Sequence, residues 1–271
     1  MSSRHTRLLG LFFAAALTPL AAVTVSQFNV AVLENFDTLA NATGSVVPPG
    51  WQFIETGTSA NTTYGAGTGS ATTGNTYSFG ATGSTERAFG SVRTSGVAST
   101  FGALVTNVTG GTITALTIEF TGEQWRLGAL GRVDQLDFSY STDATSVGTG
   151  SWLDVDALDT IAPVTSGITG ALDGNAPENQ ILISHTLSGL NLLTGSGLWL
   201  RWVDVDAVGS DDGLAIDNFS ILAVQTTTGG GGGEGGGDPQ SVPENLPTGA
   251  TATAMAGLLA LAARFRRKRT E

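Results

Sequence analysis

The sequence contains no cysteine and only two histidines among its 271 residues. Without cysteine there is no disulfide, no thiol nucleophile and no zinc–thiolate site. The Gly-x-Ser-x-Gly motif that presents a nucleophilic serine is also absent, so the usual acyl-transfer chemistry has little support. We therefore expect a protein that is not an enzyme, stabilised by its core and by a bound metal.

Lysine is missing from the long central part of the chain. Between residues 27 and 228 there are 19 aspartates and glutamates, five arginines and no lysine, and the whole chain has a net charge of −11. Nucleic acids are bound largely through lysine and arginine contacts to phosphate. This charge pattern predicts no nucleic-acid partner and favours divalent cations.

Long helical patterns are scarce, whereas alternation of apolar and polar residues is frequent. It occurs at residues 116–120, 136–140, 181–187 and 198–203, with Gly, Thr and Asn-rich turns between such segments. A period of two indicates half-buried antiparallel strands. We predict an all-β fold, a two-sheet antiparallel sandwich of jelly-roll (concanavalin-like) type with ten to twelve short strands, forming one domain over residues 27–228.

The first 26 residues have the pattern of a secretory signal peptide. Arg4 and Arg7 precede an apolar run from Leu8 to Leu17, and small residues follow up to a cleavage point expected between Ala22 and Ser26. The apolar run is too short for an ordinary membrane span. We expect a secreted protein.

The C-terminal end has three parts. A glycine-rich linker over 229–240 is followed by "SVPENLP", an apolar segment over 248–263 and the basic tip "RFRRKR". Residues 241–271 thus resemble the PEP-CTERM family of bacterial sorting signals, with Asn245 where the usual second proline stands. The resemblance implies an exosortase-type processing enzyme acting near Val242, Pro243 and Glu244, a transient membrane anchor through a short hydrophobic helix, and a location at the bacterial cell surface or in the extracellular matrix.

The central domain also resembles a known family. The segments "ENFDTL", "TGEQWRLG", "DQLDFSYSTDA" and "LWLRWVDVDAVGSDDGLAIDNFS" look like the β-domain that precedes endonuclease/exonuclease/phosphatase and lamin-tail domains in secreted bacterial proteins. "ENFD" and "AIDNFS" more distantly resemble the terminal strands of jelly-roll carbohydrate-binding and MAM-like modules. That likeness implies a structural calcium ion held by Asp37 and Asp217, with Glu34 as a third oxygen donor.

The acidic segment over 204–215 admits three interpretations. Asp204, Asp206, Asp211 and Asp212 could form a solvated hairpin, a second calcium loop or a catalytic cluster. The spacing begins like an EF-hand loop, but Val208 and Ala215 stand at positions 5 and 12, where oxygen ligands belong. A solvated hairpin and a loop calcium site both remain open, and catalysis is the least favoured of the three.

A glycan hydrolase would need a pair of carboxylates at a defined separation. Glu119 and Glu123 are the best pair, but four residues of regular strand span about 13 Å, which exceeds the separations that such enzymes use. We interpret Glu123 instead as a partner of Arg126 or Arg132. His185 is at an inward-facing position of its strand, which favours a structural role.

Five tryptophans are the remaining candidates for ligand contact. Tryptophan commonly fills sandwich cores, but Trp125 and Trp152 adjoin polar, glycine-rich sequence and are the better candidates for exposed sugar-binding platforms. The leading hypothesis is a secreted, non-catalytic protein of the exopolysaccharide or biofilm matrix with a structural calcium ion. The alternatives are a lectin-like protein that binds an extracellular polysaccharide and, less favoured, a glycan hydrolase.

Overall fold

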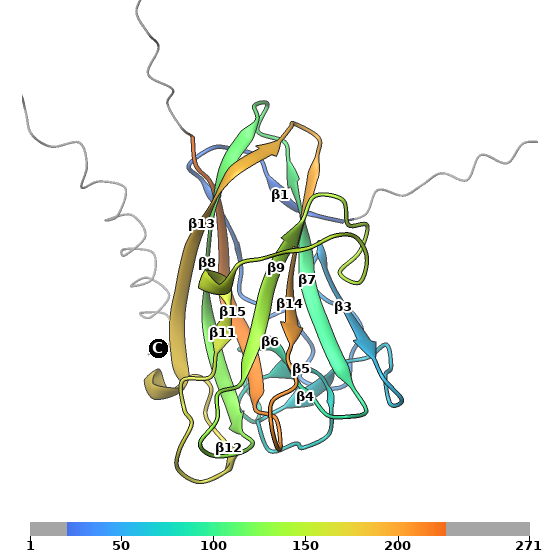
Figure 1. Ribbon diagram of the computed structural model, residues 1–271, viewed down its shortest axis with the longest axis vertical. Helices are drawn as coiled ribbons and strands as arrows, with labels where there is room; N and C mark the ends of the chain where they lie inside the picture. The colour runs from blue at the N-terminus through green and yellow to red at the C-terminus, as the bar shows by residue number, and fades with distance from the viewer. Residues whose placement is uncertain (1–20, 226–271) are drawn as a thin grey trace, which may run out of the picture. The chain divides into compact units, whose positions relative to one another are not determined.

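Two β-sheets lie face to face in the computed structural model, which describes residues 21–225 (Figure 1). Apart from the strands, this part of the chain forms two short 3₁₀ helices, η1 (Asp156–Leu158) and η2 (Pro177–Asn179). The fold class expected from the alternating sequence pattern, an all-β sandwich of jelly-roll type, is confirmed.

The first sheet has seven strands. Its main order is β1-β7-β14-β9-β10. In addition, β3 pairs with the first part of β7, and β11 pairs with β9. All of its pairs are antiparallel except that between β1 and β7. The strands are β1 (Val23–Val25), β3 (Trp51–Thr56), β7 (Ala98–Asn107), β9 (Gln135–Ser141), β10 (Leu153–Asp154), β11 (Thr160–Ile161) and β14 (Gly197–Asp204).

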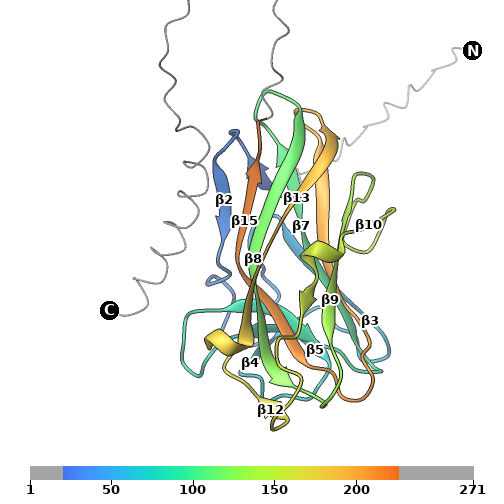
Figure 2. The same cartoon turned by 60° about the vertical axis from the view of Figure 1, so that its left-hand side comes forward.

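The second sheet has eight strands. Figure 2 shows β2, β15, β8 and β13 side by side across it, and their pairings agree with this order. β2 pairs with the second half of β15, whereas β6 pairs with its first half, and β5 and β4 extend the sheet beyond β6. β12 pairs with the end of β8. The strands are β2 (Ala31–Glu34), β4 (Gly65–Gly67), β5 (Asn75–Phe79), β6 (Ala88–Val92), β8 (Ile113–Leu127), β12 (Gly170–Ala171), β13 (Gln180–Leu192) and β15 (Gly213–Ala223).

The main core lies between the sheets and centres on Trp202. Its indole is fully buried and packs against Trp51 and Phe101 in stacked geometry, with centroids 5.9 and 6.1 Å away. Phe120 and Phe138 meet it edge to face at 5.2 and 5.0 Å. Alternation along β8, β9 and β14 brings these rings together, because every second side chain of a strand faces the same way.

A second, smaller core cluster sits apart from the first. It consists of buried residues from β5, β6, β8 and β15, with the rings of Phe79 and Trp125 stacked 5.8 Å apart. Because Ile118 and Phe120 of β8 occupy the main core, alternation places Glu123 and Trp125 on the opposite face of the sheet. This outer face is therefore itself buried near Trp125.

The predicted end segments lie outside the described residues. These are most of the signal peptide, the glycine-rich linker and the sorting segment with its apolar stretch over 248–263. Within residues 21–225, no helix is long and apolar enough to cross a membrane.

Candidate metal centre

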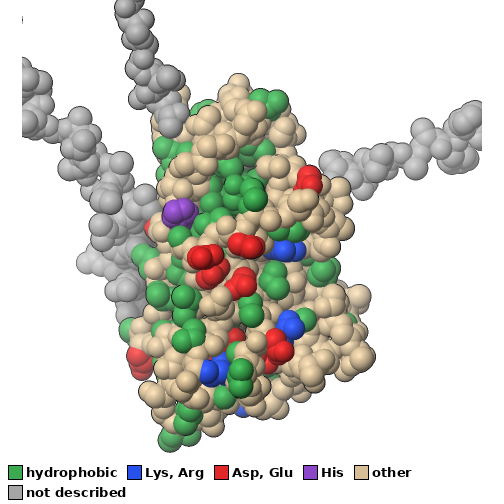
Figure 3. Space-filling view, viewed as in Figure 1, with side chains coloured by type: hydrophobic (Ala, Val, Ile, Leu, Met, Phe, Trp, Pro, Cys, Tyr) green, Lys and Arg blue, Asp and Glu red, His purple; other side chains and the backbone are tan. Residues whose placement is uncertain are grey.

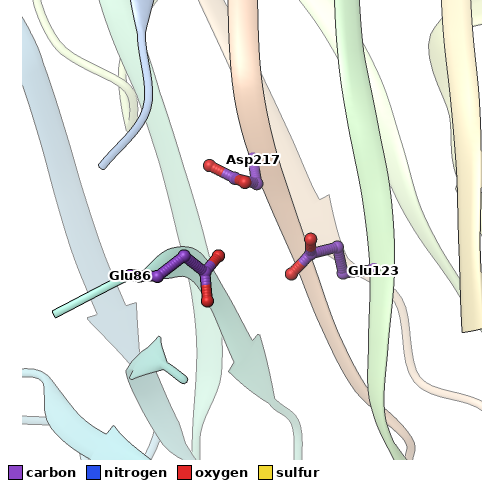
Figure 4. A group of neighbouring side chains, drawn as sticks. All are labelled: Glu86, Glu123 and Asp217. Carbon is purple, nitrogen blue, oxygen red and sulfur yellow. The ribbon is translucent and has the colours of Figure 1, made fainter. Parts of the chain in front are cut away.

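Three carboxylates from distant parts of the sequence converge beside β15. Glu86, Glu123 and Asp217 each offer an oxygen, and these oxygens lie within 4.8 Å of one another (Figure 4). Glu123 is 0% exposed and Asp217 is 1% exposed, whereas Glu86 is half-buried. Two of the three carboxylates are therefore removed from bulk water, and Glu86 keeps partial access to it.

An irregularity in β15 explains why Asp217 stands at this point. From Gly213 to Ile216 the strand pairs with β6, and from Phe219 to Leu222 it pairs with β2. Between these stretches the register against β8 shifts, and Asn218 has a φ of 51°, a left-handed conformation that asparagine tolerates better than most residues. The bulge therefore places Asp217 where the neighbour of β15 changes.

Hydrogen bonds from neighbouring side chains orient the three carboxylates. Glu123 accepts from Trp125 Nε1 at 2.9 Å and from Gln180 Nε2 at 3.0 Å. The side-chain amide of Asn175 donates to Glu86 at 2.6 Å, and that of Asn218 donates to Asp217 at 2.6 Å. Such outer contacts fix the direction of ligand oxygens in metal sites.

The donor set suits a hard divalent cation. Calcium binds six to eight oxygens at 2.3–2.6 Å, so two ligands of one ion are separated by at most about 5.2 Å. The separation within the group meets this limit. Three ionised carboxylates so close together in a buried position repel one another unless a positive charge lies between them. Carboxylates without cysteine or histidine favour calcium over zinc.

The three residues predicted for calcium have different positions. Asp217 belongs to the group. Asp37 is exposed and lies next to it, because its carboxylate accepts from the backbone N–H of Arg87 at 3.0 Å. Glu34 accepts from the backbone N–H of Phe36 at 2.8 Å and closes a local turn, and it is not one of the three converging residues.

No sequence pattern indicated Glu86 as a candidate, and the role predicted for Glu123 was a different one. Glu123 was expected to pair with Arg126 or Arg132, but Arg132 pairs with Asp134 and Asp212 at 3.1 and 3.3 Å. Nothing in the spacing of Glu86 and Glu123 indicates that they meet. The one available signal was that Glu123 follows a stretch of alternating residues and has the parity of Trp125, opposite to the core residues Ile118 and Phe120.

The aspartates of the acidic segment form a buried polar layer. Asp204, Asp211 and Asp212 are buried, so the interpretation of this segment as a solvated hairpin is wrong for them, whereas Asp206 is exposed and lies 3.5 Å from Arg93. Within residues 21–225, no three of these carboxylates come as close together as the three at the metal centre.

Internal donors satisfy these aspartates. Asp204 accepts from Ser91 Oγ at 2.6 Å, and Asp211 accepts from the backbone N–H of Ala207 at 2.9 Å. Asp212 accepts from the backbone N–H of Gly128 at 2.6 Å and from the amide of Gln124 at 2.9 Å. The segment after β14 is thereby tied to the loop after β8.

Burial changes the acidity of this layer. It raises the pKa of Asp212 to about 6, and it raises the pKa of Asp204 well above the ordinary value. Burial also raises the pKa of Asp134, against the lowering effect of Arg132 and of two backbone N–H groups. In each case the ionised carboxylate loses water that hydrogen bonds replace only in part.

The expected tryptophan platforms are covered in two ways. Trp125 is 1% exposed, so the expectation that it is an exposed sugar platform is wrong; its ring fills the smaller core cluster. Trp152 is half-exposed, but the guanidinium of Arg201 lies over its ring at 3.9 Å from the centroid. Trp51 and Trp202 fill the main core, as expected for a sandwich, and Trp199 is buried outside both core clusters.

The hydrolase pair and the histidine also differ from expectation. Glu119 is half-buried, and the fully buried Glu123 is not accessible to a glycan. His185 pairs in register with Ile118, so it stands on the inner side of its sheet as predicted, yet it is exposed. Its neighbours on the same face, Ile183 and Leu187, are buried, whereas His185 lines an open groove between β13 and β10.

Comparisons with known proteins give weak likenesses only. No family model and no curated protein matches the chain. Among solved structures, the xylan-binding CBM22-1 domain of Xyn10C from Paenibacillus barcinonensis is 10% identical, with a TM-score of 0.34 over 76% of this chain and all of that domain. TmCBM61, solved with β-1,4-galactotriose, is 12% identical with a TM-score of 0.29, over 51% of this chain and 71% of that one.

The enzymatically active domain of tailspike protein 4 from bacteriophage CBA120 is 14% identical, with a TM-score of 0.34. The match covers 65% of this chain and only 19% of the tailspike chain. With TM-scores this low, function must be argued from the residues of the chain itself.

Proposed function

We propose that the chain is a non-catalytic, calcium-stabilised β-sandwich protein of the bacterial cell surface or extracellular polysaccharide matrix. The observation that carries the proposal is the convergence of Glu86, Glu123 and Asp217 within 4.8 Å of one another. These residues come from the segment before β6, from β8 and from β15. A cation bound there links three separate segments of the second sheet, which is the task of a structural metal.

The surroundings of the metal centre support a structural role over a catalytic one. Glu123 and Asp217 are buried, and Trp125 covers Glu123 through a direct hydrogen bond. A substrate polysaccharide needs an open cleft to reach a reacting carboxylate, and a catalytic metal needs a coordination position open to substrate.

The location rests on the predicted ends of the chain. The signal-like segment at the N-terminus and the PEP-CTERM-like segment at the C-terminus favour export followed by processing at the cell exterior. Expression of the full chain in a bacterium with an exosortase-type enzyme tests this. Mass spectrometry of the secreted protein should show new ends near residues 22–26 and 242–245, and an intact intracellular chain would refute it.

Direct calcium titration tests the metal function. Calorimetry on the full chain, freed of metal with EDTA and dialysed, should show one calcium site that Asp217→Asn removes and Glu119→Gln leaves in place. Glu119 is a matched control because it lies on the same strand, four residues from Glu123 and outside the group. Release of reducing ends from extracellular polysaccharides by the purified protein would contradict the non-catalytic assignment.

Carbohydrate binding is a second candidate function, because the sandwich has an open groove at one side. This groove runs between β13 and the β9–β10 edge, and it is lined by Tyr140, Leu153, His185 and Leu187 among others. Rings and apolar side chains beside hydroxyl and carboxylate groups are suited to sugars, whose rings present both apolar faces and hydroxyls.

A further inference from the structure

The groove at the open side of the sandwich has a defined origin. β13 pairs only with β8, and β10 pairs only with β9, so both are edges. Ile183 and Leu187 of β13 face inward and are buried, but His185 between them and Leu153 of β10 are exposed, so the two edges do not close over one another here. They leave a groove of about 560 Å³, which lies within the size range of ligand sites.

The walls of the groove combine apolar side chains with the ring and hydroxyl of Tyr140 and the imidazole of His185. On one side, Tyr140 and Val155 are half-buried against the main core, and Leu153 is 59% exposed. On the other side, the buried Leu187 and the exposed His185 face inward, whereas Thr186 and Ser188 alternate with them and line only the rim, where the Thr186 hydroxyl lies 2.8 Å from that of Thr117. An exposed leucine beside a half-buried tyrosine gives an apolar contact surface that no described residue covers completely.

One end of the groove leads into an acidic depression. Asp154 lines both the groove and this adjoining depression of about 380 Å³. The depression is also lined by Asp137, Asp156 and Asp159. Figure 3 shows acidic side chains gathered on this face of the molecule, next to hydrophobic ones.

The negative charge of the depression is offset only in part by Arg201, which interacts electrostatically with Asp154. Among the described residues, none of its four aspartates forms an ion pair. Arg201 is held by Ser139 Oγ at 2.9 Å and stacks on Trp152. Burial, with added repulsion from the neighbouring carboxylates, raises the pKa of Asp159 to about 6, which is consistent with a concentrated negative potential.

We propose that the groove binds a polysaccharide that carries free amino groups, with apolar sugar faces on Leu153 and Tyr140 and ammonium groups at Asp154 and the adjoining aspartates. This inference rests on the carbohydrate-binding function proposed above. Charge complementarity selects the ligand class, because an acidic cleft concentrates cations and repels polymers of uronate, sulfate or phosphate. The excess of acidic over basic residues in the body acts in the same direction.

A cationic peptide is the competing ligand, and the edge of β13 decides against it. Extended peptides usually bind sheets by adding a strand to a free edge. Here η1 packs against β13 and covers part of that edge. The groove instead offers the hydroxyl of Tyr140 and the carboxylate of Asp154, which pair with sugar hydroxyls as well as with ammonium groups.

Binding of defined hexamers tests the proposal. Calorimetry at low ionic strength compares a glucosamine hexamer with free amino groups, its N-acetylated counterpart and hexalysine, on the full chain with calcium present. The free-amine hexamer should bind at least about tenfold more tightly than the acetylated one, and added salt should weaken it. Asp154→Asn and Leu153→Ser should each weaken binding by about fivefold. Glu178→Gln removes one exposed charge outside the groove and should change nothing.

Each other outcome overturns the proposal in a distinguishable way. Equal binding of the two hexamers, with loss in Leu153→Ser, keeps carbohydrate binding and refutes the amino-sugar assignment. Hexalysine binding that depends on both variants assigns the groove to peptides. If Glu178→Gln weakens binding of the free-amine hexamer as much as Asp154→Asn does, the binding depends on the net charge of the protein and not on the groove. If no hexamer binds while calcium still stabilises the same samples, the inference fails and the metal function stands.

Discussion

Removal of calcium should lower the melting temperature of the protein, and Asp217→Asn should abolish this dependence. The reason is the close approach of Glu86, Glu123 and Asp217. At an effective dielectric constant of about 20, two ionised carboxylates about 5 Å apart repel each other by roughly 3 kcal/mol. The proposed calcium ion would replace that repulsion by attraction, so the folded state should bind it and the unfolded chain, with these residues far apart, should not.

The size of the effect follows from linkage. A ligand present at about 100 times its dissociation constant adds about 2.7 kcal/mol to the free energy of unfolding. For a body of about 200 described residues, each kcal/mol shifts the melting temperature by about 2–4 °C. We therefore expect a rise of about 5–11 °C from EDTA to saturating calcium.

Differential scanning calorimetry on wild type, Asp217→Asn and Glu119→Gln provides the assay. Wild type and Glu119→Gln should show the full rise, and Asp217→Asn should show almost none. Magnesium should substitute poorly, because it demands a smaller octahedral cage. A wild-type melting temperature that is the same in EDTA and in calcium would refute the reasoning, as would a full calcium response in Asp217→Asn.

Three further predictions concern the core, the buried acids and the surface of the first sheet. Trp202→Ala should cost about 3–5 kcal/mol in urea unfolding because it empties the centre of the main core, and a cost below 1 kcal/mol would contradict that packing. In EDTA, the free energy of unfolding should fall as the pH rises from 4.5 to 7, because the folded-state pKa values of Asp212 and other buried aspartates are raised and their ionisation opposes folding. Asp212 alone should contribute about 1–2 kcal/mol, so Asp212→Asn should reduce the slope by that amount, and an unchanged slope would refute the assignment. Arg201→Ala should cost about 1 kcal/mol and expose the ring of Trp152 to acrylamide quenching, whereas unchanged quenching would show that the guanidinium does not shield it.

Local patterns were sufficient to predict the fold class. The alternation in residues 116–120, 136–140 and 198–203 corresponds to β8, β9 and β14, and their apolar side chains form the main core. Such patterns are reliable because each strand repeats the same two-residue rule. The number of strands was underestimated, since short strands such as β10 and β12 contain only two residues each.

The candidate site was predicted only in part. Asp217 was found through a short likeness of its strand, but Glu86 is 131 positions away and acts through tertiary proximity. Trp125 was misplaced because a second core lies on the outer face of the sheet, and a simple two-layer pattern predicts that face to be exposed. The interpretation of the acidic segment as solvated was wrong for a similar reason. Local polarity does not reveal that Gly128 and Gln124, from another part of the sequence, donate hydrogen bonds to the buried Asp212.

The position of β15 has a consequence for the order of folding. It is the last strand of the body, yet it lies in the interior of its sheet, with β8 on one side and β6 and β2 on the other. The second sheet therefore cannot close until almost the whole body has been synthesised, and long-range pairing of this kind is slow. For the proposed export of an unfolded chain, this delay would keep the chain competent for translocation. The proposed metal centre needs Asp217 of the same strand, so it would be completed last, and calcium outside the cell would then secure the finished fold.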